Sequence, residues 1–153
     1  MPKKLSKAIY FVLFLLAAAF FCGCVSSQPP AGAKQEIWKG QFTGDINGDL
    51  TITAWNVSTD KNLKVLKGEL NSKIDSVIGG YGTGTLYGNL SGQIKDGVFT
   101  ASFRGNAKVT DGSARVSGRF IGNMSEKKGA GTWNCNVTHG AMRLKGKWTL
   151  EKQ

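Results

Sequence analysis

The segment Gly84-Thr-Leu-Tyr-Gly-Asn-Leu-Ser91 carries the pattern that decides the fold. Leu86 and Leu90 alternate with polar residues, and the two glycines fall on the same side as the leucines. The same order of glycine and apolar residues returns in Gly40-Gln-Phe-Thr-Gly-Asp-Ile-Asn47 and in Gly118-Arg-Phe-Ile-Gly-Asn-Met-Ser125. Because glycine is a poor strand residue, its repeated place on the apolar side indicates a sheet that bends as it closes, or room for a neighbouring ring or a ligand.

The alternation extends outward from these segments, from Glu36 to the end of the chain. Apolar residues at every second position predict half-buried antiparallel strands, and residues such as Asp96-Gly97 and Asp111-Gly112 predict the turns between them. We therefore expect an all-β fold, an antiparallel meander of about eight strands. An up-and-down β-barrel is favoured, with a two-sheet β-sandwich as the alternative. Between the first two strands, the phases favour a three-residue turn at Asn47–Asp49.

One segment interrupts the alternation. Residues Ser72 to Gly79 have apolar residues at helical spacing and predict either a single helical turn or a strand. The glycine-rich stretch that follows, from Gly79 to Gly84, contains Tyr81 and is a candidate lid or binding loop, or else a plain connection.

The first 23 residues have a different character. Three lysines precede an apolar run from Ala8 to Phe21, which has 14 residues against the ~20 that a membrane-spanning helix needs. A basic start and a short apolar run are typical of the helix of a secretory signal peptide. The alternative is an uncleaved anchor, since extending the run to Val25 makes it barely long enough to span.

The end of this run, Phe21-Cys22-Gly23-Cys24, resembles the lipobox of bacterial lipoproteins, although Phe21 replaces the usual leucine and Cys22 a small residue. The resemblance implies that the chain is cleaved before Cys24 and that Cys24 then carries covalent diacylglycerol, which anchors the protein in a membrane. No other cofactor is expected. Val25 then implies sorting to the outer membrane, facing the periplasm or the surface. The expected organisation is a signal peptide at 1–23, a lipidated cysteine and flexible tether at 24–35, and the barrel at 36–153.

The charge is asymmetric. The chain has 20 Lys and Arg against 10 Asp and Glu, and removing the three lysines of the signal peptide leaves 17 against 10, a net charge of +7. The candidate basic surface lies on the outward faces of the sixth and last predicted strands: Arg115, Arg119, Arg143, Lys145 and Lys147. Such a face suits lipid head groups, an anionic envelope polymer or an acidic protein. The alternative, which the residues favour over a binding face, is a solvated face whose lysines protect an edge. Nucleic acid is not an expected partner, because the aromatic residues are predicted to face inward.

The final strands resemble known barrels. Gly131-Thr-Trp-Asn134 and Gly146-Lys-Trp-Thr149 are similar to the glycine–x–tryptophan elements of lipocalin-like and avidin-like barrels, and glycine-rich transferrin-binding-like lipoproteins are similar in composition. The resemblance implies a barrel and names no ligand. It leaves open a carrier that holds a small apolar ligand among the predicted inward rings: Phe42, Phe99, Phe103, Phe120, Trp133 and Trp148.

Residues for catalysis are scarce. His139 is the one histidine, and Cys135 is the one cysteine that remains beside Cys24 after cleavage, so neither a metal set nor a nucleophilic triad is indicated. Cys135 shares a face with Trp133, which predicts a buried and inert thiol. We therefore expect a noncatalytic envelope lipoprotein whose barrel is a binding module for a protein or an anionic envelope component. An apolar-ligand carrier is the alternative, and an enzyme is the least favoured.

Overall fold

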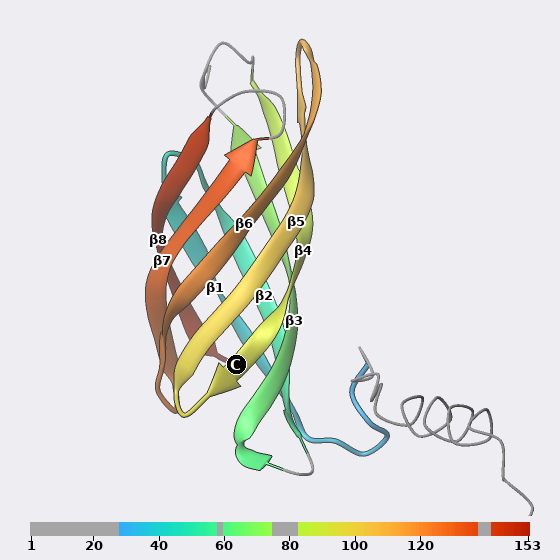
Figure 1. The fold of residues 1–153 in the computed structure, drawn as a ribbon, viewed down its shortest axis with the longest axis vertical. Coiled ribbons are helices and arrows are strands. Elements are labelled where there is room, and N and C mark those ends of the chain that lie inside the picture. Colours follow the sequence, from blue (N-terminus) through green and yellow to red (C-terminus); the bar gives the residue numbers. More distant parts are fainter. Residues whose placement is uncertain (1–27, 58–59, 75–82, 138–141) are drawn as a thin grey trace, which may run out of the picture. The chain divides into compact units, whose positions relative to one another are not determined.

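A computed structural model describes residues 28–57, 60–74, 83–137 and 142–153. Each strand pairs antiparallel with the next along the chain, and β8 pairs with β1, so the sheet closes into a barrel (Figure 1). This confirms the predicted up-and-down barrel over the sandwich. The strands are β1 (Gln35–Gly44), β2 (Asn47–Val57), β3 (Asp60–Ile74), β4 (Gly84–Lys95), β5 (Val98–Val109), β6 (Gly112–Met124), β7 (Lys128–Val137) and β8 (Arg143–Lys152). Across these four ranges, no helix has the length and apolar character needed to cross a membrane.

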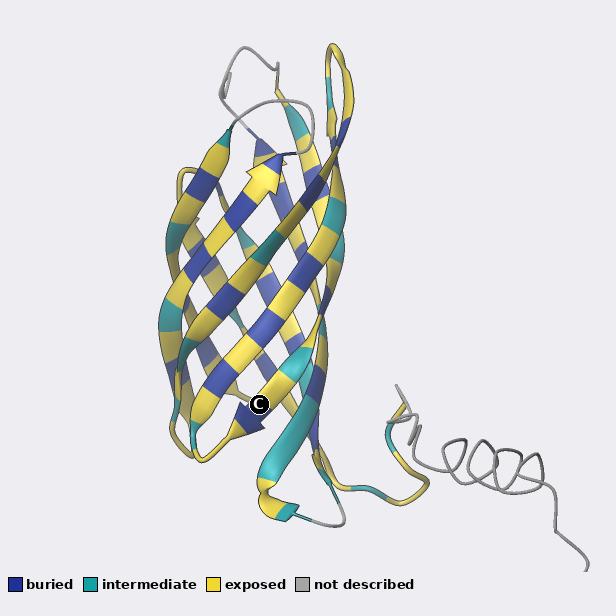
Figure 2. Ribbon diagram, viewed as in Figure 1, coloured by how far each residue is buried: buried dark blue, intermediate teal, exposed yellow. Residues whose placement is uncertain are grey.

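Buried or half-buried residues alternate with exposed ones along most of each strand, as the bands of Figure 2 show; the exceptions are the start of β3 and the buried pair Ala54 and Trp55 of β2. The inward side chains form one apolar cluster that includes rings from β1, β5, β6, β7 and β8. A closed sheet of this size has an interior just wide enough for side chains to fill. The alternation visible in the sequence therefore corresponds directly to the inside and the outside of the barrel.

Glycines make room for the rings in this narrow interior. One row of paired residues crosses four strands from Phe99 through Gly122 and Gly131 to Trp148. The rings of Phe99 and Trp148 meet above the two glycines, with centroids 4.7 Å apart. A Cβ atom on Gly122 would lie 2.5 Å from Cζ2 of Trp148. The inward glycines of the repeat therefore serve closure and ring packing, as their position in the sequence indicates.

The two ends of the barrel differ in what they carry. We call the end with Gln35, the Asp96-Gly97 turn, residues 125–127 and Lys152 the N-terminal mouth, because the chain enters β1 there. The other end, which carries the connections after β1, β3, β5 and β7, is the distal end.

The first turn differs from the prediction. The expected turn at Asn47–Asp49 is wrong, because these residues belong to β2 and the chain reverses earlier, at Asp45 and Ile46. The Lys145 amide donates to Oδ2 of Asp45 at 2.8 Å, and the Gly44 amide donates to the Asn47 side chain at 3.1 Å. These bonds fix the earlier reversal and place Ile46, 5 % exposed, in the end of the core.

The interrupted segment is a strand at its beginning. Ser72 and Ile74 are the last inward residues of β3, and the Ser72 hydroxyl donates to the Asn47 carbonyl. The alternative of a helical turn starting at Ser72 is therefore wrong for these positions. The rest of the segment and the candidate loop residue Tyr81 lie outside the described residues, as do Cys24 and His139.

Candidate functional site

The five predicted basic residues lie on one side of the barrel. Arg119 of β6 and Lys145 of β8 flank Asn134 of β7 in one row, since Arg119 pairs with Asn134 and Asn134 pairs with Lys145. Neighbouring strands lie ~4.8 Å apart, so the Cα atoms of the two basic residues are about 10 Å apart. The pairing of β7 with both β6 and β8 thus brings Arg119 and Lys145 near each other, although the sequence separates them by 26 positions.

Strand β5 adds two further cations to this side. Arg104 pairs with Ser117 of β6, in the next row after the one that holds Arg119. Its side chain and that of Lys108 are exposed. We name seven outward cations of β5, β6 and β8 the basic face: Arg104, Lys108, Arg115, Arg119, Arg143, Lys145 and Lys147.

Carboxylates are absent from most of the basic face. Strands β5, β6 and β7 contain no Asp or Glu, and the one acid of β8 is Glu151, close to the N-terminal mouth. Glu151 pairs there with Lys128, at 3.3 Å between Nζ and Oε1. On the opposite side, Asp49 of β2 and Glu69 of β3 point outward among the lysines. The net positive charge of the strands is therefore concentrated over β5–β8, which favours the approach of an anion.

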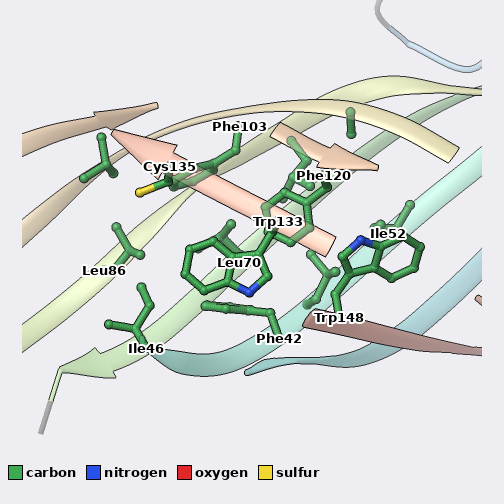
Figure 3. Packing of buried hydrophobic residues seen from close by; sticks show 14 of the residues in the cluster. Phe42, Ile46, Ile52, Leu70, Leu86, Phe103, Phe120, Trp133, Cys135 and Trp148 are labelled. Atoms are coloured by element: carbon green, nitrogen blue, oxygen red, sulfur yellow. The ribbon is translucent and has the colours of Figure 1, made fainter. Parts of the chain in front are cut away.

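Five of the six rings proposed as a ligand wall pack against another ring instead, and the Phe103 ring lies against Gly88 and Gly105. All are at most 3 % exposed, and Figure 3 shows Phe42, Phe120 and Trp133 in contact. Phe42 meets Trp133 edge-on with centroids 5.6 Å apart, and Phe120 stacks on Trp133 at 6.3 Å. None of the six lines any of four surface pockets formed by described residues. This packing favours a core role for the rings over a ligand-binding role.

Cys135 also belongs to the core. Its side chain is 2 % exposed, which confirms the predicted burial. Loss of solvation raises the pKa of the Cys135 thiol to about 11. The thiol is therefore protonated at neutral pH, and the nucleophilic thiolate is scarce. Within the described residues, no three His, Cys, Asp or Glu side chains come together in a way that could hold a metal ion.

The N-terminal mouth holds a charge cluster that the sequence analysis missed. Glu36 points into the barrel and accepts from Lys64 Nζ at 2.6 Å and from Lys152 Nζ at 2.8 Å. Lys152 Nζ also lies 5.7 Å from the centroid of the Trp38 ring. Alternation places Glu36 and Lys152 on the inward side with Trp38, so the sequence alone predicts the side on which these two residues lie. In β3, apolar residues stand on both faces around Lys64, at Leu63, Val65 and Leu66, so alternation does not assign Lys64 to a side.

The cluster changes the acidity of Glu36. Burial alone would raise the pKa of Glu36, but the hydrogen bonds and positive charges of Lys152 and Lys64 outweigh burial and hold the pKa below its ordinary value. The carboxylate is thus more stable, relative to its protonated form, in the folded state than in the unfolded chain. Its contribution to stability is complete above the unfolded pKa of about 4.3 and is lost as the pH falls through the lower folded pKa.

We expect Glu36→Gln to lower the free energy of unfolding at pH 7 by about 2 kcal/mol, because two ammonium groups lose a charged acceptor. Urea unfolding measured at steps between about pH 5 and pH 3 should show this difference shrinking as wild-type Glu36 is protonated. Glu151→Gln is the matched control, because that carboxylate is 66 % exposed and its exposed ion pair is worth about 0.5 kcal/mol or less. A difference that stays constant with pH would contradict the role given to Glu36.

Comparison with known proteins adds no family. No protein-family model matches the chain, and no curated protein matches it at significant similarity. The fold itself defines the class: an eight-stranded up-and-down antiparallel β-barrel with a packed core.

Proposed function

We propose that this protein is a noncatalytic lipoprotein of a bacterial cell envelope, anchored in the outer membrane by diacylglycerol on Cys24. Its barrel binds an anionic envelope polymer through the basic face. The segment that ends in Cys24 supports the anchor, because a basic start and a short apolar run precede it. The observation that carries the binding role is the basic face itself, which gathers seven cations on β5, β6 and β8, while Glu151 is the one carboxylate of the four strands from β5 to β8.

The position of the basic face favours a component beyond the protein's own bilayer. Arg143 begins β8 at the distal end, whereas Lys152 ends it at the N-terminal mouth, where the tether would enter. Nine residues of strand correspond to a path of about 30 Å. Arg115 also lies close to the distal end, three residues into β6. An anchored barrel would therefore present these cations away from the attachment point.

The chemistry between the cations favours a hydrophilic polymer over a folded protein. Ser117, Asn134 and Asn136 occupy outward positions between the basic residues. Protein interfaces usually have a core of buried aromatic or apolar anchors, whereas β5–β8 carry no outward aromatic residue and expose only two large apolar side chains, Val98 and Ile121. Hydroxyl, amide and cationic groups at regular spacing suit a flexible chain with repeated negative charges.

The test compares the purified full chain, held in nanodiscs, with two double variants. Mass spectrometry of its N-terminal peptide first establishes the anchor, and an unprocessed N-terminus without lipid would contradict it. Binding is then measured with dextran sulfate, and with uncharged dextran as the matched probe. We expect Arg119→Glu with Lys145→Glu to weaken binding of dextran sulfate by about tenfold or more, because two attractions become repulsions.

The control is Lys67→Glu with Lys73→Glu, which changes the net charge equally at exposed outward positions of β3. It should change the dissociation constant by less than about threefold. Equal losses in both double variants would show that net charge and not the basic face governs binding. Equal affinity for dextran, or selective capture of an acidic protein in place of the polyanion, would also contradict the proposal.

A further inference from the structure

A pocket of about 390 Å³ opens at the N-terminal mouth, away from the basic face. Its volume lies within the ~300–1,000 Å³ range of small-molecule sites. Trp38, Ile94 and Met124 give it apolar walls, and charged side chains surround them: Lys61, Lys64, Asp96 and Glu126. A site that combines apolar walls with a few polar groups is the usual form of a ligand pocket.

The rim of this pocket is held in place by backbone hydrogen bonds. The Asp96 amide donates to the Asn62 carbonyl at 3.2 Å, which ties the β4–β5 turn to β3. On the other side, the Met124 amide donates to the Gly97 carbonyl at 2.7 Å, which ties the same turn to β6. Asp96 and Gly97 both have positive φ, as a tight two-residue hairpin turn requires. The backbone of the rim is therefore preformed, and a ligand need not order it.

Trp38 differs from the two other inward tryptophans in the hydrogen bonding of its indole N–H. The indole N–H of Trp133 donates to the Thr43 carbonyl at 3.1 Å, and that of Trp148 donates to the Thr132 carbonyl at 3.1 Å. Trp38 is 2 % exposed, and its Nε1 has no acceptor. Among the buried side-chain polar atoms of the described residues, it alone lacks a partner. Buried donors are nearly always satisfied, so this one calls for an explanation.

The charges of the mouth argue against an ionic ligand. Both ammonium groups near Trp38 are already bound to Glu36, so an anion would have to compete with that carboxylate. The lining itself contains two lysines and two carboxylates, which cancel in net charge. An ion would lose its hydration without meeting a net opposite charge. An uncharged ligand avoids that penalty.

We propose that this pocket binds a small uncharged molecule with an apolar body and a hydrogen-bond acceptor, which accepts from Trp38 Nε1. The apolar body contacts Ile94 and Met124, and the flexible side chains of Met124 and Lys152 move aside as it enters. The inference does not depend on the anchor or on the basic face. It also differs from a ligand held in the centre of the barrel, where the rings fill the space.

Three probes of nearly equal shape test the proposal: acetophenone, ethylbenzene and benzoate. The full chain, labelled with ¹⁵N at its tryptophans and held in nanodiscs, is titrated with each, and Trp38→Phe identifies the Trp38 indole signal. We expect acetophenone to shift that signal downfield and to bind about tenfold more tightly than ethylbenzene, which has no acceptor. Benzoate should bind more weakly than acetophenone.

Trp38→Phe should also remove the preference for acetophenone over ethylbenzene, since it removes the donor and keeps a ring. Met124→Phe serves as a second variant, because it narrows the pocket while keeping the Trp38 signal, and it should weaken both neutral probes. Equal binding of ethylbenzene, tighter binding of benzoate, or an unmoved Trp38 signal at saturating acetophenone would overturn the proposal.

Discussion

Gly122→Ala should lower the free energy of unfolding by about 3 kcal/mol, the upper part of the range for an overpacked core. The new methyl group would meet the Ala130 carbonyl oxygen and Cζ2 of Trp148, the latter at 2.5 Å. The carbonyl is part of the sheet and cannot turn away, and the Trp148 ring is held against Phe99. Urea unfolding followed by far-ultraviolet circular dichroism measures the change.

Gly129→Ala is the matched control, because it adds the same methyl group to another inward strand glycine. Its nearest neighbour would be Sδ of Met124, at the far end of a flexible side chain on the rim of the mouth. Met124 can move, and alanine restricts the unfolded chain, so we expect a change below about 1 kcal/mol in either direction. Equal losses for the two variants would contradict the view that ring packing and backbone contact demand glycine at residue 122.

The sequence predicts most of the fold because the period of two is a physical consequence of a closed sheet. Each inward residue meets the core and each outward residue meets water, so the pattern around Leu86 and Leu90 could be read without coordinates. The first turn could not, because the bonds that place it at Asp45 come from Lys145, one hundred residues away. A prediction of turn length from the phases of the two flanking strands contains no information about a distant partner such as Lys145.

The candidate sites divide along the same line. The basic residues of β6 and β8 could be identified because alternation alone assigns their side. Arg104 belongs to the same face, yet its membership depends on β5 lying beside β6 in the closed sheet. Predicting the charge cluster at the N-terminal mouth requires more information. Glu36, Lys64 and Lys152 meet only when β1 is placed between β2 and β8 and the phase of β3 is known. Sequence periodicity gives the side of a residue, whereas the closure of the barrel gives its neighbours.

Trp148→Ala should cost about 3–5 kcal/mol, as removal of a large buried ring does. Trp148 is 1 % exposed and pairs with Phe42 of β1, at the seam where the first and last strands close the barrel. Its indole N–H lies 3.3 Å from the Ile121 carbonyl and 3.1 Å from the Thr132 carbonyl, and its ring contacts Phe99. The side chain thus connects β8 with β5, β6 and β7, while the backbone of the same residue pairs with β1.

Because Trp148 lies at the seam, Trp148→Ala should weaken the pairing of β8 with β1 as well as lower the stability of the whole barrel. Hydrogen exchange should accelerate most at the amides that join β8 to β1, since opening there turns two paired strands into free edges. Trp148→Phe keeps a ring but loses the donor, and should fall between wild type and Trp148→Ala in stability. Tyr87→Ala is the control, because that ring is 51 % exposed on β4 and its removal should cost about 0.5 kcal/mol or less. If exchange at the β8–β1 pairing were unchanged while the whole barrel lost stability evenly, Trp148 would be an ordinary core residue and not the one that holds the closure.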